Sequence, residues 1–371
     1  MSTSKVWALS LGMVGAASFV VACSSTEGGP SVAPVESVPA PTASAPAPTA
    51  SAPTSSPEGG ADDAGRAFDE SVRVRTEPCE KAAPQATRCE SYEIVCGGAS
   101  PAVVDVAYFE PPAGVAKKGV VVFGSGGGGT GFYNFPARDA LTSAGYTLVD
   151  RRWTADRGWF DGAKAGPQEA ACRYAALARY VKRTHAPSVP LCATGNSGGS
   201  AELVYALAWN GLASSLAFAM PTSGPFHRLD LFCQGQTDSA WVTETSALWS
   251  ACPGCVGKGT QAGGGVISLL DASFGGSPMC SSPGAAGLAT LLAKSPVKGP
   301  DVPRMGRLPV HLKVGALDEA AYPIFSAALH RELGAAGVNV SYEVLAGVGH
   351  EMDKYDGGVK AIRDTLLAGC K

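Results

Sequence analysis

Ser197 lies at the centre of the pentapeptide Gly195-Asn196-Ser197-Gly198-Gly199, which fits the pattern G-x-S-x-G. An apolar run precedes the pentapeptide and an apolar-periodic segment follows it, so we expect the serine on a sharp turn between a strand and a helix. Small residues two positions before and after the serine let the strand and the helix approach each other, and the hydroxyl stays exposed. The pattern predicts a nucleophilic serine. The alternative is a glycine-rich turn whose serine caps the helix.

A serine hydroxyl is a weak nucleophile at neutral pH, so it needs a base within hydrogen-bond reach and an acid that orients this base. Asp318 follows the run 309–314, and His350 follows the run 340–345. If both runs are neighbouring parallel strands, the two side chains lie at the carboxyl edge of the sheet, where Ser197 is also expected. The sequence therefore predicts that these three residues act together.

The chain has five histidines, so His350 has competitors. His227 and Asp230 follow the apolar run 216–220, and they form the alternative base and acid. The other three histidines are expected within a strand, on a helix or directly after a helix, where a structural or solvated role is expected, namely His311, His330 and His185.

The chain order of Ser197, Asp318 and His350 and the strand and helix around the pentapeptide resemble the α/β-hydrolase superfamily. The likeness extends from about Ser91 to the C-terminus. It implies the α/β-hydrolase fold. It also implies that Ser197 is the nucleophile, His350 the base and Asp318 the acid that orients the base.

A negative oxygen develops when a serine attacks an ester carbonyl, and preorganised N–H groups are needed to stabilise it. The N–H of Gly198 is the first expected donor. The superfamily places a second donor after an early strand, often in a His-Gly-Gly-Gly loop. Here the glycine-rich run 124–131 has no preceding histidine. Gly126 and Gly127 are therefore the best candidates for this second donor, and Ser125 is the next.

The same loop supports a rival interpretation. Gly124, Gly126 and Gly129 match G-x-G-x-x-G after a strand, and Asp150 ends the next strand about twenty residues later, as in a dinucleotide-binding fingerprint. Two antiparallel-looking strands precede the loop, however, and a dinucleotide site leaves the predicted serine, aspartate and histidine unexplained. A further alternative is a tethered binding protein on a catalytically dead hydrolase scaffold, which the presence of all three residues disfavours.

The elements that must position these residues alternate between strands and helices from about residue 91 on. Two alternating segments predict antiparallel opening strands, and the later apolar runs predict a mostly parallel central sheet with helices on both faces. The segment 225–305 loses this alternation and is rich in glycine, proline and cysteine, so it is expected to form a lid-like insertion. Expected strands are 91–95, 103–109, 119–123, 146–149, 190–194, 216–220, 309–314 and 340–345; expected helices are 137–143, 167–182, 200–209, 322–333 and a last one that ends near 367.

Three aromatic residues follow the expected strand 146–149, namely Trp153, Trp159 and Phe160. Two interpretations are open for them. They either form the wall of an acyl pocket or belong to the core.

The N-terminal segment is typical of an export signal. Lys5 precedes the uncharged apolar run 6–22, which is shorter than the ~20 residues of a membrane span. The run ends at Cys23 in a sequence that resembles the lipobox of bacterial lipoproteins. The segment 1–22 is therefore expected to be removed and Cys23 to carry lipid; an ordinary signal peptide is the alternative. No aspartate directly follows Cys23, so we expect an anchor in the outer membrane of the bacterial cell envelope.

Residues 23–65 are rich in proline, alanine and serine and have almost no large apolar side chains. Such a segment cannot form a core, so it predicts a disordered tether. Residues 66–371 are then expected to form the α/β-hydrolase catalytic domain.

The chain has eleven cysteines, of which ten remain when Cys23 is set aside. An even number of cysteines in an exported protein indicates disulfides, whose pairing the sequence leaves open. Cys252 and Cys255 form a C-x-x-C pair that is also found in zinc sites and redox motifs. No second pair of this kind accompanies it, so we expect no metal.

The formal net charge is −3 and no Lys/Arg-rich stripe is present, so no nucleic-acid partner is expected. The sequence thus predicts a lipid-anchored serine hydrolase that cleaves small or polymeric carboxylic esters through an acyl-enzyme, without a metal or organic cofactor. A peptidase or a polyester depolymerase on the same fold is the alternative.

Overall fold

The computed structural model describes residues 69–79, 81, 83–224, 227–234, 246, 255, 264–318 and 322–371, which all fall within the unit 61–371. The predicted signal peptide, Cys23 and the predicted tether lie outside the described residues. Most of the segment 235–263 with Cys252 also lies outside them.

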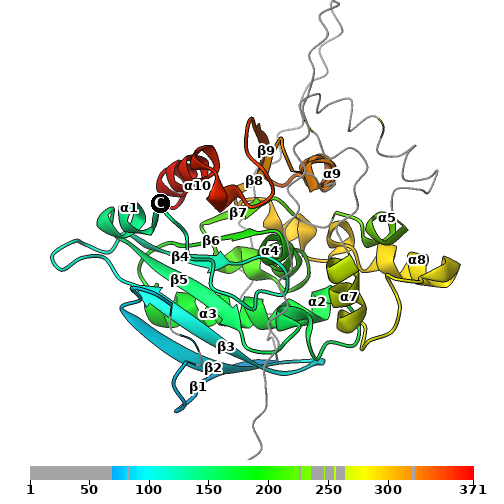
Figure 1. Ribbon diagram of the computed structural model, residues 1–371, viewed down its shortest axis with the longest axis horizontal. Helices are drawn as coiled ribbons and strands as arrows, with labels where there is room; N and C mark the ends of the chain where they lie inside the picture. Colours follow the sequence, from blue (N-terminus) through cyan, green and yellow to red (C-terminus); the bar gives the residue numbers. More distant parts are fainter. Residues whose placement is uncertain are drawn as a thin grey trace, which may run out of the picture. The chain divides into compact units, whose positions relative to one another are not determined.

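Within the described residues, nine strands form one sheet in the order β1-β2-β3-β5-β4-β6-β7-β8-β9 (Figure 1). The pairs from β1 to β5 are antiparallel, and all later pairs are parallel. The sheet is therefore mostly parallel with an antiparallel beginning, as predicted. The strands are β1 (Glu70–Val74), β2 (Arg88–Cys96), β3 (Ala99–Phe109), β4 (Gly119–Gly124), β5 (Tyr146–Trp153), β6 (Leu191–Asn196), β7 (Phe218–Thr222), β8 (Val310–Gly315) and β9 (Val340–Leu345).

The central strands are buried along their whole length because helices cover both faces of the sheet. Every residue of β4, β5 and β6 is buried, in agreement with the apolar runs from which these strands were predicted. One face packs against α3 (Cys172–His185), α4 (Gly198–Trp209) and α9 (Tyr322–Ala335). The other face packs against α1 (Arg138–Ser143) and α10 (Asp356–Gly369), which lie together in Figure 1. This confirms the predicted α/β-hydrolase fold class.

Strand β5 is four residues longer than the run 146–149 predicted, and the reason is electrostatic. Arg151 and Arg152 continue the strand although both side chains are buried. Arg151 forms an ion pair with Glu202, and Arg152 donates to Asp105 over 2.7 Å. A buried charge is tolerated when it is paired, so the strand continues through the two arginines.

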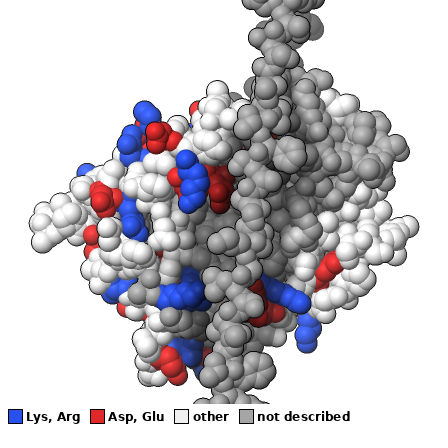
Figure 2. All heavy atoms as spheres, in the orientation of Figure 1, with Lys and Arg blue, Asp and Glu red and all other residues white. Residues whose placement is uncertain are grey.

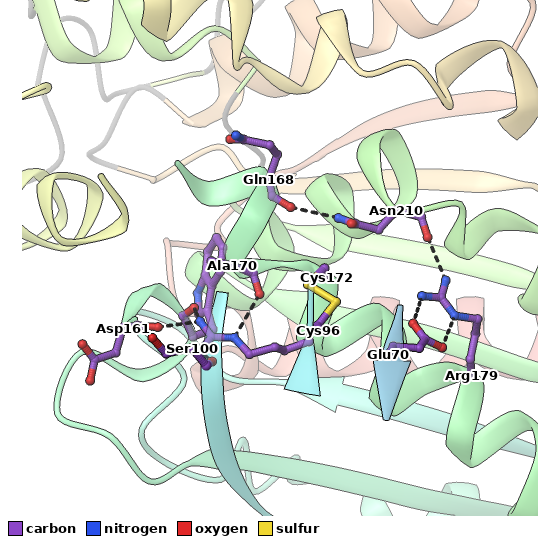
Figure 3. The surroundings of a disulfide bond; sticks show 11 residues. Glu70, Cys96, Ser100, Asp161, Gln168, Ala170, Cys172, Arg179 and Asn210 are labelled. Carbon is purple, nitrogen blue, oxygen red and sulfur yellow. Dashed lines mark hydrogen bonds and ion pairs between the residues drawn. A yellow bond between two sulfur atoms is a disulfide. The ribbon is translucent and has the colours of Figure 1, made fainter. Parts of the chain in front are cut away.

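Other element bounds also differ from the prediction, and one strand was missed. The expected helix 167–182 is divided into α2 (Pro167–Ala170) and α3. Strand β1 was not predicted at all. Arg179 on α3 forms an ion pair with Glu70 of β1 and donates to the backbone oxygen of Asn210 over 2.7 Å (Figure 3). This tertiary contact helps to hold β1 at the edge of the sheet.

Between β7 and β8 the described residues form helices and no strand, in agreement with an insertion at this place. The helices are α5 (Leu229–Gln234), α7 (Gly264–Ser273), α8 (Gly284–Ala293) and the short 3-10 helices η3 (Pro296–Lys298) and η4 (Val302–Met305). Figure 1 shows α5, α7 and α8 on one side of the domain, where α5 packs against α8 and α7 against α2. A role of this insertion as a lid stays a prediction.

All nine described cysteines are disulfide-bonded, which confirms the predicted disulfides. One disulfide joins the end of β2 to the start of α3 (Figure 3), and another joins β6 to the C-terminal end of α10. The described pairs are Cys79–Cys89, Cys96–Cys172, Cys192–Cys370 and Cys233–Cys280. Cys255 is disulfide-bonded as well, so its sulfur is not a thiolate ligand for zinc.

The charged side chains of both signs are interspersed over the described part of the face shown in Figure 2. Among the described helices, none combines the length and the apolar character that crossing a membrane requires.

Candidate functional site

Ser197 occupies the turn between β6 and α4 with φ 54° and ψ −116°. A positive φ is unusual for a residue with a side chain and costs free energy, so the surrounding structure must enforce it. The Ser197 N–H donates to the backbone oxygen of Thr222 over 3.0 Å. The hydroxyl is thereby presented at the carboxyl edge of the sheet.

The glycines of the pentapeptide are required by close backbone contacts. A Cβ atom on Gly195 would lie 2.6 Å from the carbonyl carbon of Gly199, and one on Gly199 would lie 2.4 Å from the oxygen of Gly124. Both distances are too short for real atoms. Any side chain at these positions would therefore separate β6, α4 and β4.

A hydrogen bond joins the side chains of His350 and Asp318. The His350 Nδ1 atom lies 2.9 Å from the Oδ2 atom of Asp318, whose side chain is fully buried, whereas the histidine side chain is 34% exposed. When Nδ1 carries the proton and donates it to this carboxylate, Nε2 is left as the acceptor. The loops that carry the two residues are also joined, because the Leu317 N–H donates to the oxygen of Val348 over 2.8 Å.

Asn196 links the turn to the histidine loop. Its Nδ2 atom donates to the backbone oxygen of His350 over 3.2 Å, and its Oδ1 atom accepts from Thr222 over 3.1 Å. The sequence analysis missed this residue. The available signal was its place directly before the serine, at the end of the strand that reaches the functional edge.

The glycine loop lies directly against the turn. A Cβ atom on Gly198 would lie 1.8 Å from the oxygen of Gly127, and one on Gly126 would lie 3.3 Å from the Cβ atom of Ser197. Within the described part of the chain, neither the Gly126 nor the Gly127 N–H donates to another group of the protein. The Ser125 hydroxyl donates to the oxygen of Gly131 and helps to close the loop. The structure thus brings the three predicted N–H donors beside the serine.

Ser197, His350 and the glycine-rich loop line one pocket of about 340 Å³. It contains Ser197 and His350, the expected donor loop, the aromatic Phe132 and Tyr133 that follow this loop, and a charged rim. Its lining residues are Ser125, Gly126, Gly127, Gly131, Phe132, Tyr133, Asn196, Ser197, His350, Glu351, Asp353 and Lys354.

The aromatic residues that were considered for an acyl pocket belong to the core. Trp153, Trp159 and Phe160 are each at most 1% exposed and do not line this pocket. Trp153 Nε1 donates to Glu202 over 2.9 Å. Phe132 and Tyr133 line the pocket in their place, and the sequence analysis did not single them out.

A buried ion pair connects the elements around the turn at Ser197. Arg151 of β5 binds Glu202 of α4, and both side chains are fully buried. A Cβ atom on Gly129 would lie 2.2 Å from the Arg151 guanidinium, so the pair also contacts the glycine loop. Burial raises the pKa of Glu202 to about 7, and the charge of Arg151 opposes this shift. The pair ties the donor loop, β5 and α4 together.

The alternative base and acid lie elsewhere. His227 is 2% exposed, and burial lowers its pKa to about 3, with the positive charges of Arg228 and Arg331 adding to the effect. Its Nε2 atom has no hydrogen-bond partner among the described residues. Asp230 forms an ion pair with Arg228. Of the two predicted acids, it is Asp318 that contacts His350.

The dinucleotide interpretation does not fit the loop. The glycines are followed by an irregular segment, and the next helix, α1, begins only at Arg138. Asp150 is buried and accepts hydrogen bonds from the N–H groups of Tyr133 and Asn134, both over 2.9 Å. A dinucleotide site needs the glycines at a helix N-terminus and an acidic side chain open to the ribose. Asp150 instead holds the segment after the glycine loop.

Tyr322, the first residue of α9, completes the surroundings of His350. Its ring stacks on the His350 ring with a centroid distance of 4.9 Å. The sequence analysis did not predict a role for this residue. Among the described residues, no group of three or more His, Cys, Asp or Glu side chains is arranged to hold a metal ion.

No protein-family model and no curated protein matches this sequence. Similar solved structures include a puromycin-hydrolyzing peptidase of Mycobacterium tuberculosis, with 18% identity over 73% of this chain and 37% of that chain and a TM-score of 0.47. They also include an acylaminoacyl peptidase of Pyrococcus horikoshii, with 14% identity, 74% and 40% coverage and a TM-score of 0.49. A thermophilic esterase from the planctomycete Thermogutta terrifontis has 13% identity, 73% and 94% coverage and a TM-score of 0.44.

The chain spans less than half the length of the two peptidases, and about nine-tenths of the length of the esterase. With identities below 25% and TM-scores below 0.5, these likenesses carry no argument about the reaction. The activities in their names belong to those proteins.

Proposed function

We propose that this protein is a serine hydrolase that cleaves carboxylic esters through a covalent acyl-enzyme, with Ser197 as nucleophile, His350 as base and Asp318 as orienting acid. The observation that carries the proposal is the His350–Asp318 hydrogen bond of 2.9 Å at the pocket that also contains the strained Ser197. A serine with this backbone conformation and a histidine held by a buried carboxylate are the parts that acyl transfer requires.

The first half of the reaction forms the acyl-enzyme. His350 Nε2 takes the proton of Ser197 while the Oγ atom forms a bond to the ester carbonyl carbon. His350 then gives this proton to the alcohol oxygen as the bond between that oxygen and the acyl carbon breaks. Asp318 holds the ring in the required tautomer and stabilises the imidazolium that forms between these two transfers.

The second half releases the acid. His350 takes a proton from water as the water oxygen attacks the acyl carbon, and it returns the proton to Oγ when the bond to Ser197 breaks. In both halves the negative carbonyl oxygen needs N–H donors. The N–H groups of Gly198, Gly126 and Gly127 are proposed for this role because the loop and the turn are in contact beside Ser197.

The proposed place of action is the bacterial cell envelope. The sequence around Cys23 supports lipidation of this cysteine, and the proline-rich segment after it supports a tether between the anchor and the catalytic domain. The disulfide-bonded cysteines of the folded domain agree with an oxidising compartment.

A fluorophosphonate probe tests the proposed chemistry, since only an activated serine attacks it. The full chain is expected to be labelled at Ser197, and Ser197→Ala is expected to abolish labelling. Ser214→Ala is the control, because the Ser214 hydroxyl donates to the Gly211 backbone oxygen away from the pocket. A folded protein that is not labelled contradicts the proposal.

A set of p-nitrophenyl esters of increasing chain length and a set of N-acylated peptides then separate an esterase from a peptidase. Turnover of the esters with no turnover of the peptides is the expected result. Faster turnover of the peptides would replace the ester assignment by the peptidase alternative.

A further inference from the structure

The proposed N–H donors for the negative carbonyl oxygen belong to two separate parts of the chain. The N–H of Gly198 lies at the start of α4, whereas Gly126 and Gly127 lie on the glycine loop after β4. Donors of this kind are effective when they are fixed relative to one another before the reaction. Among the residues that the structure describes, no hydrogen bond joins residues 125–131 to α4. The position of the loop therefore depends on the other groups that it contacts.

The Arg151 side chain contacts both ends of the glycine loop. A Cβ atom on Gly124 would lie 2.8 Å from the Nη2 atom of Arg151, and one on Gly129 would lie 2.2 Å from its Nη1 atom. The planar guanidinium thus occupies the space that side chains at these two positions would need. Between them, the Gly129 N–H donates to the oxygen of Gly126 over 3.0 Å. A displacement of the guanidinium would therefore move the segment that carries two of the proposed donors.

Glu202 connects this guanidinium to α4. Its side chain accepts hydrogen bonds from Nη2 of Arg151 and, over 2.9 Å, from Nε1 of Trp153. Within the described part of the chain, the Nε and Nη1 atoms of Arg151 have no hydrogen-bond partner, so Glu202 determines the orientation of the guanidinium. Glu202 lies four residues after Gly198, which is about one turn of the helix. Arg151 and Glu202 together therefore join the loop donors to the helix that carries the Gly198 N–H.

We propose that Arg151 is a positioning residue, which is held by Glu202 and sets the distance between the N–H groups of the glycine loop and the N–H of Gly198. This inference rests on the proposed function. Arg151 is fully buried and does not line the pocket, so it acts through the loop and not by contact with the substrate. It transfers no proton.

The variant Arg151→Lys separates this role from the charge of the ion pair. A lysine keeps the positive charge and can still pair with Glu202, but its single ammonium group cannot contact both ends of the loop as the planar guanidinium does. Arg179→Lys is the matched control. Arg179 also binds a glutamate, Glu70, with two of its nitrogen atoms, and it does not line the pocket. The control therefore makes the same change in a second ion pair away from the loop.

The experiment measures kcat and KM for a p-nitrophenyl ester and the affinity for a trifluoromethyl ketone. Ser197 can add to this ketone, and the adduct then carries the negative oxygen that the N–H groups are proposed to stabilise. The corresponding methyl ketone is the reference ligand, because its carbonyl stays uncharged. Melting temperatures show whether each variant folds.

We expect Arg151→Lys to lower kcat and the trifluoromethyl ketone affinity by about tenfold to a hundredfold, the effect of misplacing or losing a donor. KM and the methyl ketone affinity should stay unchanged, because the negative oxygen is absent from both complexes. Arg179→Lys should retain all four values. A loss of stability alone would not weaken the trifluoromethyl ketone selectively.

Gly129→Ala tests the same contact from the side of the loop. Its Cβ atom would overlap Nη1 of Arg151, so kcat and the trifluoromethyl ketone affinity should fall as in Arg151→Lys. Gly114→Ala is the control for backbone strain. Gly129 and Gly114 both have a positive φ, of 72° and 85°, but a Cβ atom on Gly114 would have no atom within 4 Å.

Two results overturn the inference. One is a folded Arg151→Lys variant that keeps the wild-type kcat and trifluoromethyl ketone affinity. The other is a loss of equal size in Arg151→Lys and Arg179→Lys. Fluorophosphonate labelling of the wild type tests the proposed function separately: an unlabelled wild type refutes that function, whereas a labelled wild type with either of the two results refutes only the role of Arg151.

Discussion

The Nδ1 atom of His350 lies 2.9 Å from the Oδ2 atom of Asp318, although 32 positions separate the two residues in the sequence. The bond is possible because β8 and β9 are parallel neighbours, with Gly315 opposite Leu345 at their carboxyl ends. The loops after these two strands therefore begin at the same edge of the sheet. Strand pairing therefore brings Asp318 and His350, which are distant in the sequence, within hydrogen-bond distance of each other.

Removal of the Asp318 charge tests this contact. We expect Asp318→Asn to lower kcat by about 10⁴-fold, as loss of the orienting carboxylate does in other serine hydrolases, because His350 then adopts the wrong tautomer. Steady-state ester hydrolysis measures the effect. Asp230→Asn should change kcat far less, since Asp230 binds Arg228. The opposite order of the two variants would assign the acid to Asp230.

Asn196 should control the position of the histidine loop. Asn196→Ala removes the hydrogen bond to the His350 oxygen, and we expect kcat/KM to fall by about tenfold, the size of one ordinary hydrogen bond. The Asn210→Ala variant is the control, because the Asn210 side chain binds the oxygen of Gln168 at a distance from the pocket (Figure 3). Equal losses in both variants would show a general effect on stability.

Asp150 should make the stability depend on pH in the acid range. Burial raises the pKa of Asp150 to about 6, against the opposing effect of the N–H groups of Tyr133 and Asn134. The folded state then binds the proton more tightly than the unfolded state. The stabilising contribution is fully present below about pH 4 and is lost as the pH rises through 6.

Chemical denaturation between pH 3 and pH 8 measures this effect. Relative to Asp150→Asn, the wild type should lose roughly 3 kcal/mol of unfolding free energy between about pH 4 and pH 6, and the difference should be constant above that range. Asp139→Asn, at an exposed position on α1, should follow the wild type. A difference that changes in the opposite direction would mean that the two N–H groups dominate.

The disulfides should contribute unequally to stability. Cys192 and Cys370 are 178 positions apart, whereas Cys79 and Cys89 are 10 apart. In the chain-entropy model, the longer loop corresponds to about 2.5 kcal/mol more stabilisation. Replacing Cys192 and Cys370 together by alanine should therefore lower the melting temperature more than the same change at Cys79 and Cys89. Calorimetry of the two double variants decides the order.

The proposed anchor can be tested apart from catalysis. Cys23→Ala should release the protein from membranes or block processing of the signal peptide, because it removes the cysteine at which the lipobox-like sequence ends. Partition into detergent, followed by labelling of Ser197, measures both properties. Labelling should be retained. A variant that still partitions into detergent as the wild type does would contradict lipidation at this cysteine.

Much of the fold could be predicted because local patterns carry it. The buried parallel strands are continuous apolar runs, and the run 340–345 coincides with β9. Predictions failed where a distant partner determines the outcome. Arg151 extends β5 because Glu202 on α4 pairs with it, and β1 has Glu70 bound to Arg179. The partner residues Glu202 and Arg179 are far away in the sequence, so the local pattern around Arg151 or Glu70 does not include them.

The features of the candidate site can likewise be separated into those that the sequence predicts and those that depend on the tertiary structure. The sequence by itself determined the turn at Ser197, since glycines at fixed spacing around a serine specify a backbone conformation locally. It also determined that Asp318 and His350 follow parallel strands. Only the tertiary structure decided that Asp318 and not Asp230 contacts His350, and that the Tyr322 ring stacks on the His350 ring. Such contacts depend on the pairing of strands and the packing of helices over the whole domain, which no local pattern encodes.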